Sequence, residues 1–193
     1  MNAASDRYLY PGTDVLKNLR DVRQSDRLAQ FEAEAATRRI IELIDAPAPG
    51  SFDTAHIQAI HKRIFQDVYV WASQFRTVNI SKGGQLFGAA AFIESVLHDI
   101  FQKLLRERYL MGLDPESFST RAGFFLAEIN AVHPFRDGNG RAQREFIRQL
   151  GLQAGFAIDW SRIERGRMME ASRASFRTGD SSGLAALIFM SMV

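Results

Sequence analysis

The chain has 193 residues, of which 46 % are hydrophobic, and its formal net charge at pH 7 is +2. A chain of this length can bury a core of its own without disulfides or metal ions. The mild charge does not indicate a nucleic-acid partner, and no stretch is long and apolar enough to span a membrane. Because the sequence has no cysteine and no apolar leader, we expect one soluble, cytoplasmic domain over residues 1–193.

Periodic apolar positions predict helices along most of the chain, so the expected fold class is all-α. The first helix is expected over residues 27–44, and the prolines and glycine of residues 47–50 mark the turn that follows it. A second helix, Thr54–Phe65, places apolar residues at positions i, i+3 and i+7 of one face. Further helices are expected near residues 92–106, 161–176 and 181–192.

The segment of residues 76–88, RTVNISKGGQLFG, interrupts this helical pattern. Val78 and Ile80 alternate with polar residues, and apolar residues return after a Gly83–Gly84 break. Alternation broken by two glycines predicts a β-hairpin. Because an isolated hairpin is only marginally stable, it should lean on the helices or on a ligand.

Two further helices are expected to flank the most informative part of the chain. Residues 118–131 are apolar around most of the helical circumference, which predicts the central buried helix. Residues 141–154 form the next periodic segment, and Gly155 is a suitable C-cap. Residues 133–144, HPFRDGNGRAQR, therefore form a loop between helices and the start of the second one.

The chemistry of this motif suits a phosphate-bearing substrate. Gly138 and Gly140 lack a Cβ, so backbone N–H groups around Asn139 can face an anion at the start of a helix, where the helix dipole adds positive potential. Asp137 precedes this cradle and is a hard oxygen ligand suited to Mg²⁺, which usually binds through one or two carboxylates and the substrate phosphates.

Three more side chains of the motif complete this chemistry. Arg141 and Arg144, three residues apart, share one helix face and offer forked donors to phosphate oxygens. His133 has an unperturbed pKa that permits proton abstraction near neutral pH, so it is the natural general base. Phe135 is interpreted as an apolar anchor that holds the loop against the core.

Each of these residues also has an ordinary interpretation when taken singly. His-Pro is a common boundary between helix and loop, Asp-Gly-Asn-Gly is a tight turn, and two arginines commonly form a solvated helix face. The eight specified positions of H-x-F-x-D-G-N-G-R-x-x-R, however, would agree by chance only roughly once in 10¹⁰ starts at average residue frequencies. The combination therefore indicates a functional site.

Residues 133–144 resemble the signature of the Fic family, H-x-F-x-[D/E]-G-N-G-R-x-x-R, at every specified position. Family members with this signature typically transfer AMP from ATP to a Ser, Thr or Tyr hydroxyl of a target protein and release pyrophosphate. The resemblance implies that His133 is the base and Asp137 the Mg²⁺ ligand. It further implies that the anion hole is formed by Gly138, Asn139 and Gly140. Arg141 and Arg144 would then hold the β- and γ-phosphates. In the related Doc kinases a lysine replaces the second glycine, so Gly140 favours nucleotidyl transfer over phosphorylation.

The resemblance extends beyond the signature, with a Fic core expected over about residues 54–176. The hairpin of residues 76–88 resembles the Fic flap, which aligns the target backbone by strand addition beside the active site. The residues of this flap that would contact the target are Ile80, Lys82, Gly83 and Phe87. A plain connecting hairpin is the alternative interpretation.

Many Fic proteins inhibit themselves through a helix with the pattern [S/T]-x-x-x-E-[G/N], and this chain has no match to it. The nearest segment is Ser161–Gly166, in which Arg165 stands in the Glu position and Glu164 falls one residue early. A shift of one residue rotates a helical side chain by about 100°. We therefore expect a separate small antitoxin whose Glu reaches Arg144, as in toxin–antitoxin Fic proteins. Small bacterial Fic toxins commonly modify the ATPase subunits of DNA gyrase and topoisomerase IV, which are candidate targets.

Several alternatives remain open at the level of sequence. Transfer of UMP, phosphocholine or phosphate is the first, because the pocket for the base lies outside the signature. A binding module that grips a nucleotide or phosphorylated partner without chemistry is the second. The arginines of residues 162–177 are interpreted as a solvated face, with a docking surface for an acidic antitoxin or nucleic acid as the rival. His56, His61 and His98 lack neighbours at metal-ligand spacing and are interpreted as core or surface histidines.

Overall fold

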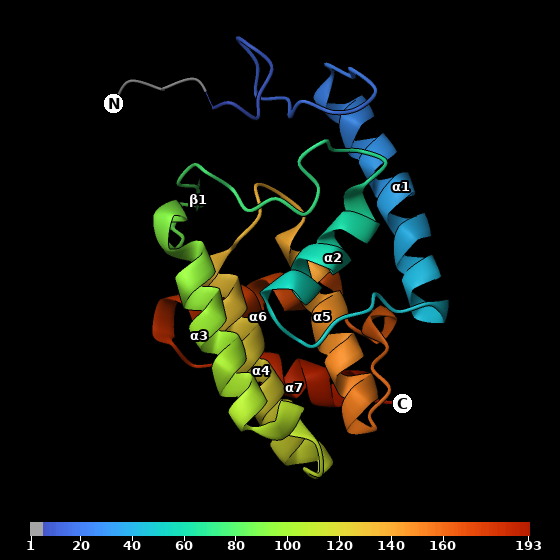
Figure 1. Ribbon diagram of the computed structural model, residues 1–193, viewed down its shortest axis with the longest axis vertical. Coiled ribbons are helices and arrows are strands. Elements are labelled where there is room, and N and C mark those ends of the chain that lie inside the picture. The colour runs from blue at the N-terminus through green and yellow to red at the C-terminus, as the bar shows by residue number, and fades with distance from the viewer. Residues whose placement is uncertain (1–5) are drawn as a thin grey trace.

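The computed structural model describes residues 6–193 as a bundle of helices with one short hairpin (Figure 1). The α-helices of this part are α1 (Ser25–Asp45), α2 (Thr54–Phe65), α3 (Ile93–Arg106), α4 (Pro115–Val132), α5 (Asn139–Ala154), α6 (Arg165–Thr178) and α7 (Ser182–Ser191). Within these residues, no helix combines the length and apolarity needed to cross a membrane. The all-α prediction is confirmed.

Side-chain caps mark the starts of α2 and α4. The side chain of Asp53 accepts a hydrogen bond from the N–H of His56 and starts α2 at the predicted residue. Asp114 caps α4 in the same way, with a proline in the first turn, so this helix begins three residues before the predicted Phe118. The prediction of a helix from residue 161 was early, because residues 160–162 form a 3₁₀ turn capped by Asp159 and α6 begins only at Arg165.

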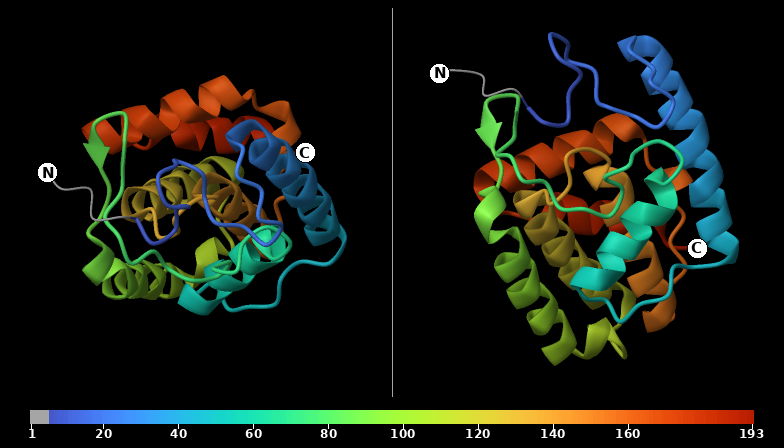
Figure 2. Two further views of the ribbon diagram at one scale, coloured as in Figure 1. Left: turned by 90° about the horizontal axis from the view of Figure 1, so that it is seen from above. Right: turned by 45° about the horizontal axis from the view of Figure 1, so that its top comes forward.

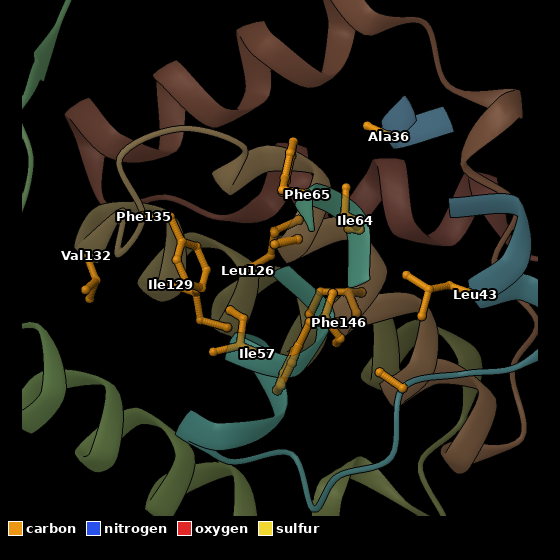
Figure 3. Close-up of a cluster of buried hydrophobic side chains, with 14 of the residues drawn as sticks. Ala36, Leu43, Ile57, Ile64, Phe65, Leu126, Ile129, Val132, Phe135 and Phe146 are labelled. Atoms are coloured by element: carbon orange, nitrogen blue, oxygen red, sulfur yellow. The ribbon is translucent and has the colours of Figure 1, made fainter. Parts of the chain in front are cut away.

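Helix α4 lies at the centre of the bundle and contacts α3, α5, α6 and α7 (Figures 1 and 2). Eight of its residues are buried, in agreement with the predicted central helix. The core side chains come from helices far apart in the chain, including Ile64 of α2, Ile129 of α4 and Phe146 of α5 (Figure 3). All three side chains have no exposed surface. The bundle therefore gives the ends of α4 and α5 a rigid support.

The hairpin is shorter than the alternating pattern predicted. Strands β1 (Ser81–Lys82) and β2 (Gln85–Leu86) pair antiparallel through a two-residue turn, Gly83–Gly84, whose φ angles are +58° and +80°. Two successive positive φ angles favour glycine at both positions, as in a type I′ turn. Val78 lies outside the ladder, and its carbonyl accepts a hydrogen bond from the buried Arg76 side chain.

We predict that Gly123→Ala destabilises the bundle. A Cβ at Gly123 would lie 2.8 Å from the backbone nitrogen of Ala185, so α4 and α7 would have to separate. Overpacking of this kind typically lowers the free energy of unfolding by about 1–3 kcal/mol. Urea denaturation measures the change, and Gly166→Ala in α6, where a Cβ meets no atom within 4 Å, is the matched control. Equal stability of the two variants would contradict the close α4–α7 contact.

Candidate active site

The residues of the motif line a cavity of about 1260 Å³. The loop of residues 133–138 joins the end of α4 to the start of α5 and contributes to the lining, together with the hairpin, α1, α5 and α6. His133, Asp137, Arg141 and Arg144 all contribute to the lining. The structure thus brings together the charged side chains that the sequence singled out.

His133 ends α4 in a left-handed conformation, with φ = +50°. Its Nδ1 lies 3.3 Å from the carbonyl oxygen of Asn130, so Nδ1 carries the proton and Nε2 keeps its lone pair. Burial, assisted by the positive charges of Lys82 and Arg76, lowers the pKa of His133 to about 4. The imidazole is therefore neutral at pH 7 and can accept a proton at Nε2.

The ring of Phe87 lies parallel to the His133 imidazole, with 3.8 Å between ring centroids and an interplanar angle of 17°. Phe87 also contacts Phe176 of α6 edge-on. Phe87 therefore packs between α6 and the imidazole of His133, the candidate general base. Lys82, Gly83 and Phe87 of the predicted flap line the cavity, whereas Ile80 is not part of the lining.

The backbone of the loop is held by buried side chains from three parts of the chain. Phe135 is fully buried in the core (Figure 3). Its ring stacks on that of His61 with 3.8 Å between the ring centroids, which confirms the predicted anchor. The side chain of Asn139 accepts from the N–H of Phe135 and donates to its carbonyl, both at 2.8 Å. The imidazole of His61 accepts from the N–H of Ser73 at Nδ1 and donates from Nε2 to the carbonyl of Asp137.

These contacts change the interpretation of Asn139. Its side chain is 2 % exposed and both of its polar atoms are bonded to Phe135. The side chain therefore shapes the loop, and only the backbone N–H of Asn139 is left to face an anion. The N–H groups of Asn139 and Gly140 stand at the positive end of α5 and have no acceptor among residues 6–193.

Gly138 is required at the start of this cradle for two reasons. Its φ is +78°, which favours glycine, and a Cβ would lie 2.2 Å from the ring of Phe65. A Cβ at Gly140 would lie 3.3 Å from a guanidinium nitrogen of Arg144. A larger side chain at Gly140 would therefore displace the arginine nearest to it.

Asp137 is exposed at the lip of the cradle, and one of its oxygens accepts a hydrogen bond from the N–H of Gly138 at 2.6 Å. The described part of the chain holds no cluster of three or more side chains that could bind a metal ion by themselves. A single free carboxylate beside a phosphate cradle nevertheless fits Mg²⁺, which takes most of its ligands from substrate phosphates and water.

The two arginines differ in their surroundings, which the sequence did not predict. Arg141 donates to Glu32 of α1 at 2.6 Å and lies over the ring of Phe65. Glu32 also accepts a hydrogen bond from the hydroxyl of Tyr69. The negative charge of Glu32 compensates Arg141, and α1 thereby becomes part of the site.

Arg144 has no carboxylate partner among the residues that the structure describes. Burial lowers its pKa, and the neighbouring charges of Arg141 and Arg165 lower it further. A guanidinium stays protonated at neutral pH in spite of such shifts. Arg144 is therefore an uncompensated cation that an anion in the cavity would stabilise.

The sequence missed Glu32, His61 and Arg76 as residues of this site. No local pattern distinguishes Glu32 from the other acidic residues of α1, and its partner Arg141 is 109 residues away. His61 and Arg76 act on the loop from α2 and from the base of the hairpin. Only the packing of these segments shows which polar side chains face the loop.

Known proteins resemble this chain in sequence over most of its length. Residues 51–150 match the model of the Fic/DOC family. The protein adenylyltransferase VbhT of Bartonella schoenbuchensis is 45 % identical over 96 % of this chain, which spans 38 % of that protein's length. The probable protein adenylyltransferase Fic of Escherichia coli is 37 % identical over 97 % of this chain and 92 % of its own. The chain belongs to the Fic/DOC family.

Solved structures of the family carry nucleotides. The BepC protein of Bartonella tribocorum with bound AMPPNP is 27 % identical, with a TM-score of 0.91 over 96 % of each chain. A Fic domain from Bartonella quintana with bound ADP is also 27 % identical, with a TM-score of 0.92 over 96 % of this chain and 94 % of its own. The helical bundle described above is the Fic fold.

We predict that His61 makes the stability of the protein sensitive to acid. Burial lowers its pKa from 6.5 to about 3, so the unfolded chain binds a proton below pH 6.5 that the native protein does not. The free energy of unfolding should therefore fall as the pH is lowered from 6.5 towards 3. Urea denaturation at several pH values measures the slope of the free energy of unfolding against pH. This slope should be shallower for His61→Gln than for the wild type, by up to about 1.4 kcal/mol per pH unit. His98→Gln, on the exposed side of α3, is the matched control, and equal slopes for the wild type and His61→Gln would refute the prediction.

Proposed function

We propose that this chain transfers AMP from ATP to a hydroxyl group of a target protein. The observation that carries the proposal is a neutral His133 with a free Nε2, held beside unpaired N–H groups at the start of a helix. A phosphate-binding module needs the helix end but no base. Relatives at 37 % and 45 % identity are named protein adenylyltransferases, and solved relatives bind AMPPNP and ADP.

The proposed reaction joins the target hydroxyl to the α-phosphorus of ATP. Nε2 of His133 takes the proton of the hydroxyl as its oxygen attacks the α-phosphorus. The bond between the α-phosphorus and the oxygen that bridges it to the β-phosphate breaks, and pyrophosphate leaves. The N–H groups of Asn139 and Gly140 would stabilise the negative charge on the phosphate oxygens.

The two arginines would bind the negatively charged phosphates of the nucleotide. Arg144, which lacks a carboxylate partner, would bind the terminal phosphates most strongly. Arg141 is held by Glu32, so its guanidinium is already oriented and would donate its remaining N–H groups. Asp137 would hold Mg²⁺, which neutralises phosphate charge when bound.

The hairpin would receive the target protein. An unpaired strand edge can accept an extended segment of a partner by backbone hydrogen bonding. Lys82, Gly83 and Phe87 stand at the cavity, where they would place the target side chain against the base. The hairpin would therefore align the target, and the loop would carry out the chemistry.

His133→Ala should abolish transfer while nucleotide binding persists. Loss of a general base lowers rates by about 10²–10⁴-fold, whereas the phosphate cradle belongs to the backbone of the loop and α5. The measurement is label transfer to proteins of a bacterial lysate from α-labelled ATP with Mg²⁺, with the ATP Kd determined by calorimetry. His98→Ala, exposed on α3, is the matched control.

A parallel reaction with γ-labelled ATP separates the alternatives. His133-dependent label from the α-position alone supports AMP transfer, and label from the γ-position alone would show a kinase in spite of Gly140. If neither appears, labelled UTP and CDP-choline test the transfer of other groups. Nucleotide binding without any transfer would favour a binding module.

We further propose that a separate antitoxin restrains this activity. Arg144 pairs with no carboxylate of residues 6–193. In the segment where a self-inhibiting helix would supply a Glu, this chain has the cation Arg165, which lies near Arg144. A Glu from a partner would compensate a buried charge that the chain itself leaves uncompensated.

Expression of the chain without a partner should therefore arrest bacterial growth, whereas expression of His133→Ala to the same level should not. Growth curves and immunoblots measure this. Purified ATPase subunits of DNA gyrase and topoisomerase IV serve as candidate acceptors for the α-label. Unchanged growth with active enzyme in the cells would refute the toxin role and leave the enzyme activity standing.

A further inference from the structure

Arg76 is the largest of the fully buried side chains, with 2 % of its surface exposed. It lies at the base of the hairpin, outside the signature of residues 133–144. Long cationic side chains are seldom buried unless they are paired, because removing a charge from water is costly. The burial of Arg76 therefore calls for an explanation.

The guanidinium of Arg76 joins the hairpin to the candidate base through backbone carbonyls. Nε donates to the carbonyl of His133 at 2.8 Å, and Nη2 donates to that of Val132 at 3.0 Å. On the hairpin side, Nη1 donates to Val78 at 2.7 Å and Nη2 donates to Gly88. Four of its five N–H groups are thus used, two on each side.

The charge of Arg76 is compensated by dipoles alone in the described part of the chain, since no carboxylate forms an ion pair with it there. The carbonyls of Val132 and His133 stand at the end of α4, where the helix dipole is negative. Burial lowers the pKa of Arg76, but a guanidinium stays charged at neutral pH. The end of α4 therefore binds a cation from another segment.

The hairpin needs this link because its own ladder is only two residue pairs long, Ser81 with Leu86 and Lys82 with Gln85. A ladder of this length cannot define the position of the hairpin by itself. Two further backbone bonds tie the same segments together, from Arg76 to Pro134 and from Gly88 to Ala131. Both arms of the hairpin are therefore attached next to His133.

We propose that Arg76 is a positioning residue that holds the target-binding hairpin and the base His133 in one fixed arrangement. The inference rests on the proposed function for the role of the hairpin. Arg76 is not itself a lining residue of the cavity, and its contact with the site is to the backbone of His133. It acts through the backbone of His133 and the two arms of the hairpin, so that a bound target segment and Nε2 keep a constant separation.

The test compares Arg76→Lys, which keeps the charge but loses the forked donors, with Arg76→Met, which loses both. Gly123→Ala is the control for a loss of stability far from the hairpin. Hydrogen exchange of residues 78–88 is measured in each folded variant. Both Arg76 variants should exchange these amides at least about 10-fold faster than Gly123→Ala. Exchange no faster than in the control would overturn the proposal.

A second readout follows the imidazole of His133 by NMR titration. Burial is the main cause of the lowered pKa of this group; Lys82 and Arg76 lower it further, whereas the carboxylate of Asp137 raises it. Arg76→Met should therefore raise the pKa of His133, and Arg76→Lys should raise it less. A pKa that is the same in both variants and the wild type would count against the link. If only Arg76→Lys folds, it still tests the link, because a loosened hairpin would let water reach the imidazole and weaken the burial that lowers the pKa of His133.

The functional readout is transfer of α-label to lysate proteins at saturating ATP. Both Arg76 variants should lose at least about 10-fold in transfer while the ATP Kd stays within about 2-fold of the wild-type value. An equal loss in Gly123→Ala would assign the effect to stability alone. If the wild type transfers no label, the proposed function fails, whereas hydrogen exchange still decides the positioning role.

Discussion

The structure depends on holding an irregular loop, residues 133–138, rigidly between two helix ends. The backbone of this loop belongs to no helix and no strand, so other groups must bind it. Asn139 bonds to Phe135, His61 bonds to Asp137, and Arg76 bonds to His133. Each of these side chains is buried and each acts on a different residue of the loop. The loop is therefore rigid although it lacks regular structure.

The two helix ends that meet at this loop have opposite electrostatic character. The negative end of α4 is occupied by Arg76, whereas the N–H groups of Asn139 and Gly140 at the positive end of α5 have no partner among residues 6–193. Arg144 and Arg165 add further positive charge on the same side of the cavity. Arg144 and these N–H groups thus leave positive potential at the cavity that an incoming anion would compensate. Such an arrangement sacrifices stability for binding, which is common at functional sites.

Helix positions could be predicted because periodicity and capping are local properties. Thr54–Phe65 was predicted with the bounds it has, and the first turn of α4 was missed only because the polar residues after Asp114 hide its start. The hairpin was predicted too long, since alternation cannot reveal that the N–H of Gly88 donates to the carbonyl of Ala131 in α4. Long-range hydrogen bonds of this kind compete with a ladder and leave no trace in the local pattern.

The sequence by itself determined the composition and order of the candidate site. Twelve consecutive residues place His133 at the end of one helix and Arg144 on the next, because chain geometry over so short a span permits little else. Only the tertiary structure decided which arginine is compensated, since Glu32 reaches Arg141 from 109 residues away. It likewise decided that the Asn139 side chain is hydrogen-bonded to the backbone of Phe135 and that Arg76 donates to the carbonyl of His133. Partners of this kind depend on how α1, α2 and the hairpin pack around the loop, and packing is a property of the whole chain.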